Sequence, residues 1–227
     1  MEMIPPVLFA SFLLIITAVA QDLRSCYSVT MDAWTVFSKP HRFDMHQRNY
    51  NYSYGGKDSL CVRIRAEPST IVRNTVTKNF TYLNMSSSPP RRPSALINIT
   101  FLEYAPERET KITYIHPKIV ATTPGYSVAP PSWNFLFVAE YCFVVALHGL
   151  YINECERSAN RRSGSNSILN HDSCFKERCE LWVRGGHVGI FNLGKWRNDI
   201  DCCQKFFNQT CATSTVVQVY HRQICRL

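Results

Sequence analysis

The sequence contains no G-x-S-x-G, H-E-x-x-H or P-loop motif, which are common carriers of nucleophilic, zinc-dependent and nucleotide-dependent chemistry. Its seven histidines have no metal-ligand spacing: His41, His46, His116, His148, His171, His187 and His221. The chain also lacks a folded nucleic-acid-binding motif. We therefore expect a protein that is not an enzyme, needs no metal or cofactor and does not bind nucleic acid.

Long apolar runs are also scarce, and neither of the two present predicts a membrane span. Val7–Ile16 is shorter than the roughly 20 residues that a span needs, and it precedes Ala18-Val19-Ala20, a pattern typical of a signal-peptidase site. The second run, Phe135–Ile152, contains Glu140 and is rich in the aromatic and β-branched residues of buried strands. We predict a signal peptide over residues 1–20 and a single exported domain over residues 21–227.

Cysteine, by contrast, is abundant, and all ten cysteines follow the predicted signal peptide. An even number of cysteines in an exported chain indicates a disulfide set. All 25 basic residues and 16 of the 17 acidic residues also follow it, so the mature chain has a net charge of +9, which favours anionic glycans or membrane surfaces. Five Asn-x-Ser/Thr sequons predict a glycoprotein, at Asn51, Asn79, Asn84, Asn98 and Asn208.

Strand-like runs dominate the mature chain and are separated by turn signals such as Pro124-Gly125. A short helix is predicted at Met31–Phe37 and a longer one at Asp199–Cys211, with Asp199 as its N-cap. The seven main predicted strands are Phe43–Tyr50, Leu60–Ala66, Ile71–Leu83, Leu96–Tyr104, Lys111–Val120, Phe135–Leu150 and Cys179–Arg184. If the longest is split, about eight strands form an antiparallel barrel or sandwich with minor helical content, and a last short strand, Val216–Tyr220, follows the second helix.

The adjacent cysteines Cys202 and Cys203 lie in the predicted second helix, where neighbouring side chains point about 100° apart. A bond between them would strain the backbone, so we expect two bridges that lead to different parts of the fold. Together with "DAW" (Asp32–Trp34), "CFVV" (Cys142–Val145) and "CELWV" (Cys179–Val183), the run "CCQKFFNQTC" resembles the tick salivary lipocalins, which include histamine-binding proteins.

The resemblance covers nearly the whole mature chain and implies an eight-stranded lipocalin barrel with a ligand cavity and a C-terminal helix on its wall. It also implies the disulfides Cys26–Cys202, Cys61–Cys225 and Cys142–Cys203. Four cysteines remain, and we pair them as Cys179–Cys211 and Cys155–Cys174, an assignment that the sequence leaves open. The amine-binding signature of the family is altered here, because Cys155-Glu156-Arg157 stands far upstream of Glu180-Leu181-Trp182.

Strand alternation identifies candidate ligand-binding side chains. If Cys179 faces the wall, Glu180 and Trp182 face the cavity, and a carboxylate beside an indole suits a protonated amine. The resemblance places the Glu of "CELWV" in the amine site. Outward sequons at Asn98 and Asn79 turn a second set of side chains inward, Phe101, Glu103, Lys78 and Tyr82.

Other roles stay open for these residues. Glu180 could pair with an Arg, Trp182 could be core, and Trp34 could plug the barrel base. Lys78 suits a carboxylate ligand, but a Lys78–Glu103 pair would make the pocket apolar.

The leading functional hypothesis is a salivary protein that sequesters a small host mediator, in evasion of host defence. A biogenic amine, histamine or serotonin, is the first ligand class and an eicosanoid or fatty acid is the second. The competing class is an inhibitor of complement or haemostasis that binds a host protein through surface loops. The polar, Ser/Asn-rich segment Glu156–Asp172, between Cys155 and Cys174, is the candidate loop.

Overall fold

A computed structural model describes residues 25–50, 59–103, 113–128, 132–148, 178–185, 193–211 and 216–225. At positions 67–72, 103, 113, 114 and 148 it describes the backbone alone. The predicted signal peptide, the candidate loop with its pair Cys155–Cys174, and the sequon at Asn51 lie outside the described residues.

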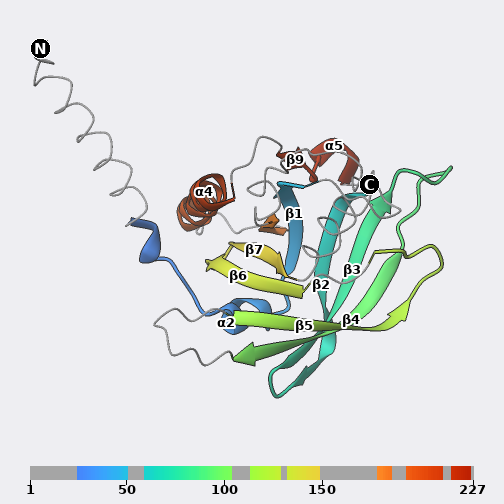
Figure 1. The fold of residues 1–227 in the computed structure, drawn as a ribbon, viewed down its shortest axis with the longest axis horizontal. Helices are drawn as coiled ribbons and strands as arrows, with labels where there is room; N and C mark the ends of the chain where they lie inside the picture. The colour runs from blue at the N-terminus through green and yellow to red at the C-terminus, as the bar shows by residue number, and fades with distance from the viewer. Residues whose placement is uncertain are drawn as a thin grey trace, which may run out of the picture.

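Nine antiparallel strands form one curled sheet (Figure 1). They are β1 (Arg42–Arg48), β2 (Ser59–Val72), β3 (Thr75–Asn84), β4 (Ser94–Glu103), β5 (Thr113–Thr122), β6 (Ser132–Val138), β7 (Cys142–His148), β8 (Cys179–Gly185) and β9 (Val217–Gln218). Strands β2 to β8 neighbour one another in chain order, and β1 pairs with both β8 and β2. The first eight strands therefore close into the predicted barrel, and β9 is a short addition beside β1.

The structure agrees with one expected division of a strand and corrects another. The longest predicted strand is split into β6 and β7 by a tight turn, in which Ala139 N donates to Cys142 O at 2.9 Å. The prediction of one strand over Ile71–Leu83 was wrong, because a two-residue turn at Arg73-Asn74 separates β2 from β3. Arg73 adopts a left-handed φ of 54°, a conformation that Gly, Asn or Asp would have signalled and Arg does not.

The short first helix, α2 (Ala33–Phe37), closes one end of the barrel. Asp32 is its N-cap and accepts a hydrogen bond from Thr35 N at 2.9 Å. Met31 N donates to Val138 O at 2.8 Å, which ties the helix to the end of β6. Phe37 is buried inside the barrel. We call this the α2 end.

The long helix α4 (Leu193–Thr210) packs outside the barrel, against β6, β7 and β8 (Figure 1). It begins six residues before the predicted start, so the assignment of Asp199 as N-cap was wrong. Asp199 is a fully buried residue inside the helix, and Lys195 donates to its carboxylate at 3.2 Å. The first turns, residues 193–198, are mostly exposed and contain Gly194 and Asn198, which have low helix propensity.

Three disulfides fasten α4 to the rest of the domain: Cys26–Cys202, Cys142–Cys203 and Cys179–Cys211. The adjacent cysteines thus bond to different partners, as predicted. A fourth bridge, Cys61–Cys225, joins β2 to the C-terminal helix α5 (Arg222–Cys225).

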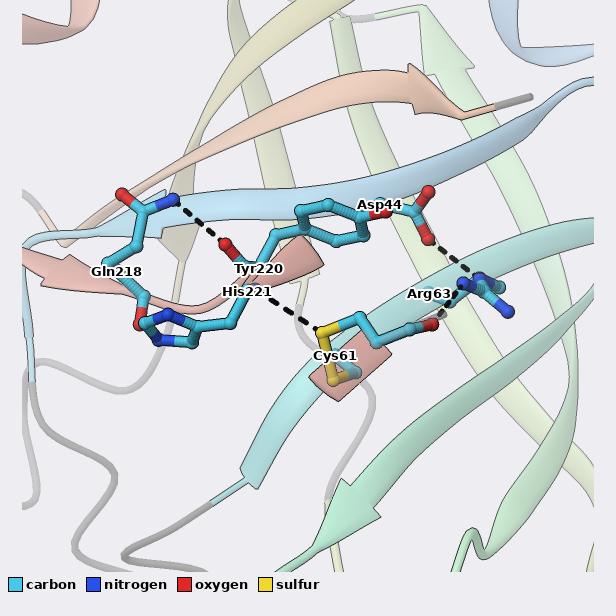
Figure 2. Close-up of a disulfide and its surroundings, with 7 residues drawn as sticks. Asp44, Cys61, Arg63, Gln218, Tyr220 and His221 are labelled. Atoms are coloured by element: carbon cyan, nitrogen blue, oxygen red, sulfur yellow. Dashed lines mark hydrogen bonds and ion pairs between the residues drawn. A yellow bond between two sulfur atoms is a disulfide. The ribbon is translucent and has the colours of Figure 1, made fainter. Parts of the chain in front are cut away.

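Figure 2 shows this last bridge beside a part-buried ion pair, in which the half-buried Arg63 donates from Nε to Oδ1 of the buried Asp44 at 2.7 Å. The same arginine reaches Cys225 O at 3.5 Å, and His221 N donates to Cys225 Sγ at 3.3 Å. The C-terminal segment is therefore held to the β1–β2 side of the barrel by one covalent bond and several polar contacts.

Candidate functional site

Strand β8 is buried on both faces, and its two faces have different chemistry. Cys179, Leu181 and Val183 belong to the core beneath α4. Trp182 belongs to the core inside the barrel. Glu180, two residues earlier on the same face of β8, accepts a hydrogen bond from the Trp182 indole. This is the orientation that strand alternation predicted from the wall position of Cys179.

The carboxylate of Glu180 is fully buried and hydrogen-bonded at both oxygens. Tyr50 donates its hydroxyl to Oε1, and Trp182 Nε1 donates to Oε2 at 2.9 Å. Burial raises the pKa of Glu180, whereas these two hydrogen bonds and the nearby charge of Arg48 act to lower it. The site thus holds a carboxylate whose charge depends on its immediate neighbours.

Arg48 lies directly opposite Glu180 in the pairing of β1 with β8 and is itself buried. Its guanidinium lies 5.7 Å from the centre of the Tyr50 ring, and Arg178 lies 5.9 Å from the same ring. Arg48 therefore has two roles: its guanidinium makes a cation–π contact with Tyr50, and its positive charge lies beside Glu180. The hypothesis that Glu180 pairs with an arginine stays a prediction, although Arg48 is near enough to act to lower the pKa of Glu180.

Strand alternation alone did not identify Arg48 and Tyr50 as part of this site. The pairing register shifts between Met45 and Gln47, which is the mark of a β-bulge. Before the bulge Met45 lies opposite Trp182, and after it Arg48 lies opposite Glu180, so both face inward although an odd number of positions separates them. Neither Gly nor Pro marks the bulge in the sequence.

Aromatic rings fill the space around the Glu180 site. The Trp133 and Trp182 ring centres are 5.3 Å apart, and Phe143 stacks on Trp182 at 5.9 Å. Trp133 Nε1 approaches Glu180 closely enough to lower its pKa, but it reaches hydrogen-bond geometry with none of the described residues. Trp133, which precedes the predicted strand, was missed for that reason.

Lys78 is a further inward-facing charge and lies nearer the α2 end than Glu180 and Arg48. Its Nζ donates to Lys39 O at 3.1 Å and stands 4.8 Å above the centre of the Phe37 ring. Burial lowers the pKa of Lys78 from 10.5 to about 8. Near neutral pH the side chain is still mostly protonated, so the barrel holds an acidic site and a basic site.

An apolar cavity adjoins Lys78. Its water-accessible volume is about 10 Å³, close to what a single water molecule requires. Its lining residues are Ile64, Lys78, Phe80, Ile97, Ile99, Ile115, Pro117 and Trp133. This part of the interior is mostly filled by side chains.

The other predicted ligand residues, Phe101, Trp34, Tyr82 and Glu103, do not gather around Glu180. Phe101 is buried, and the part-buried Trp34 meets its ring edge-on at 5.3 Å, which suits the alternative role of Trp34 as a plug. Tyr82 is buried and its hydroxyl bonds to residues 125 and 127. The side chain of Glu103 lies outside the described part of the structure, so its proposed pairing with Lys78 stays a prediction.

Four sequon asparagines are on the described surface. Asn79 and Asn98 are half-buried on the outer face of β3 and β4, and Thr77 donates to Asn98 Oδ1 at 2.8 Å. Asn84 ends β3 and accepts a hydrogen bond from Ser86 N at 3.0 Å. Asn208 is exposed on α4. Glycosylation at these positions stays a prediction.

Within the described ranges, no group of three His, Cys, Asp or Glu side chains is placed to hold a metal ion. Helices long and apolar enough to cross a membrane are likewise absent from the described part.

The family described as tick histamine binding protein matches residues 24–226. No curated protein matches the chain. The family match covers nearly the entire sequence after the predicted signal peptide, and it agrees with the barrel, the helix on its wall and the disulfides. The chain belongs to the tick histamine-binding protein family.

Proposed function

We propose that this family member sequesters a small protonated amine, histamine or serotonin, inside its barrel, with Glu180 as the anionic contact. The observation that carries the proposal is the position of the Glu180 carboxylate, fully buried on the inner face of β8 among Tyr50, Trp133 and Trp182. A buried carboxylate among aromatic rings offers an ammonium group both an ion pair and cation–π attraction.

Binding of an amine at Glu180 requires local rearrangement, because both oxygens of its buried carboxylate already accept hydrogen bonds, from Tyr50 and Trp182. Arg48 is the neighbour whose displacement matters most, since its charge faces the same carboxylate from β1. An ammonium group bound at Glu180 would take the place of the Arg48 guanidinium as the cation nearest the carboxylate. The affinity for the amine then depends on how far the Arg48 guanidinium moves away, because the two positive charges repel each other.

The proposed setting is tick saliva, where the protein would remove an inflammatory mediator of the host. Four disulfides in the described residues fit an oxidising, extracellular compartment. The predicted signal peptide and sequons support the same route.

Titration calorimetry with histamine and serotonin tests the proposal on the wild type and on Glu180→Gln. The substitution keeps the shape of the side chain and removes its charge, so amine affinity should fall by roughly 30-fold to several thousand-fold. Lys78→Met is the matched control, because it removes an inward charge elsewhere and should leave amine affinity in place. If Glu180→Gln binds amines as the wild type does, the site lies elsewhere, and Glu103 is the next residue to test.

A second candidate ligand is a fatty acid or eicosanoid, favoured by the apolar cavity beside the Lys78 ammonium. Its carboxylate would pair with Lys78 while its chain replaced the apolar packing. Native mass spectrometry of the secreted protein would detect a co-purified lipid. Lys78→Met should abolish that binding, and Glu180→Gln should leave it unchanged.

A further inference from the structure

Residues 123–128, which follow β5, fold back across the barrel end opposite α2. Thr123 fixes the start of the segment, because its N–H donates to Ser94 O at 2.9 Å and its hydroxyl accepts from Ser94 N at 2.8 Å. Ser94 begins β4 and pairs with Thr81. The Glu180 site is at this same end, since β1 starts near α2 and reaches Arg48, opposite Glu180, only at its last residue.

The sequence dictates the shape of this segment. Tyr126 N donates to Thr123 O at 3.2 Å, which closes a four-residue turn with Pro124 and Gly125 at its centre. Gly125 has a φ of +86°, as the third residue of a type II turn requires. Tyr126 is half-buried and Val128 is buried, while residues 123–125 and Ser127 are exposed.

Beyond the Thr123–Ser94 contacts, the hydroxyl of Tyr82 on β3 also joins this turn to the barrel wall. Tyr82 Oη accepts a hydrogen bond from Ser127 N at 3.1 Å and lies 3.3 Å from Ser127 Oγ and 3.4 Å from Gly125 O. The ring of Tyr82 also meets Tyr126 at 5.7 Å. Tyr82 is almost fully buried, so its hydroxyl bonds to the segment instead of to solvent.

The inner side of the segment leads to the acidic site by ring contacts. Tyr126 meets Phe80 edge-on at 6.5 Å, and Phe80 meets Trp182 at 6.4 Å. Trp182 donates to Glu180, and Phe80 also lines the cavity near Lys78. We infer that residues 123–128 form a lid over the Glu180 end of the barrel and that the Tyr82 hydroxyl is its latch.

In this role Tyr82 holds the lid and is a positioning residue instead of the ligand contact that the sequence suggested. The inference deepens the proposed function, because a ligand on its way to Glu180 would need the lid to open. The lid itself is tested without any ligand, so its failure can be told apart from a failure of amine binding.

Hydrogen exchange on the full, disulfide-intact protein is the first test. Tyr82→Phe keeps the ring and removes the hydroxyl, so amide exchange in residues 123–128 should become about fivefold faster, the factor for one ordinary hydrogen bond. Ser127→Ala keeps the N–H donor and should have a smaller effect. Tyr220→Phe is the matched control, because that ring stacks on His46 away from the lid. Unchanged exchange in Tyr82→Phe would overturn the latch.

Acrylamide quenching of the buried tryptophan emission, from Trp133 and Trp182, tests whether the lid controls access. Quenching should become faster in Tyr82→Phe by a similar factor. Gly125→Ala should act in the same direction, since a Cβ there meets no atom within 4 Å but is strained by the positive φ. Faster exchange without faster quenching would show that the segment is latched but does not gate the interior. If amines bind, Tyr82→Phe should raise their association and dissociation rates together.

Discussion

The two faces of β8 are both buried, yet they are held in place by different means. On the outer face, Cys179 bonds to Cys211 of the α4 segment and the neighbouring strand is bridged by Cys142–Cys203. On the inner face, Glu180 and Trp182 depend on hydrogen bonds and ring contacts. The wall is fixed covalently, and the interior can therefore carry polar groups whose arrangement is suited to a ligand instead of to stability.

The largest effect should follow removal of a bridge from the wall. The Cys142–Cys203 bridge closes a loop of 61 residues, and the chain-entropy model gives it about 4 kcal/mol of stabilisation. The double variant Cys142→Ala/Cys203→Ala should lose that amount in guanidinium unfolding. Unchanged tryptophan emission under native conditions would serve as the control that the inner face is still packed. A loss below about 1 kcal/mol would contradict the covalent account of the wall.

The buried charge of Lys78 should give the next largest effect, with a sign that depends on pH. Its pKa is lowered by burial from 10.5 to about 8, so the folded protein binds this proton less tightly than the unfolded chain. Stability should therefore rise with pH between those values, and below about pH 8 the charge costs up to roughly 3 kcal/mol. Lys78→Met should be more stable than wild type near pH 7, less so near pH 9.5.

Urea unfolding of both proteins at the two pH values measures this difference. The hydrogen bond from Lys78 to Lys39 O offsets part of the cost, so the observed gain should be smaller than the upper figure. A difference that does not change with pH would mean that Lys78 has the same pKa in the folded and the unfolded protein, and so that burial does not shift it.

On the inner face of β8, the interaction between Glu180 and Arg48 should give the next largest effect. These side chains are buried opposite one another, so a double-mutant cycle with Glu180→Gln and Arg48→Met should show a coupling of about 2 kcal/mol in unfolding. The same Arg48→Met variant should bind amines more tightly, because it removes the competing cation. Additive unfolding energies would show that the two charges act independently.

Much of the barrel wall around β7, β8 and α4 could be predicted from the sequence, because the cysteine positions indicate its disulfides and the alternation of side chains indicates which face of a strand is buried. Alternation from Cys179 placed Glu180 and Trp182 inside, and the family resemblance implied three of the four described bridges. The partners of Glu180 could not be predicted in that way. A bulge next to His46 changes the inward parity of β1, and only the three-dimensional pairing brings Arg48 and Tyr50 to β8.

The start of α4 is a second feature that could not be predicted from the sequence. The sequence predicted a start at Asp199 because Asp is common at N-caps, whereas the helix begins at Leu193. Only the second half of the helix is fastened to the barrel wall by buried contacts and disulfides.

The smallest effect should come from the exposed ion pairs of the wall. Glu140, in the turn between β6 and β7, lies 3.3 Å from Lys195 and 3.9 Å from Arg184, and all three side chains are at least a quarter exposed. Lys195 keeps its bond to Asp199 when Glu140 is replaced. Glu140→Gln should therefore cost no more than about 0.5 kcal/mol in urea unfolding, and less in high salt. Glu180→Gln, on the inner face, makes the same chemical change where water cannot compensate for it. If Glu140→Gln costs as much, the wall depends on its charges, and the contrast between the two faces of β8 fails.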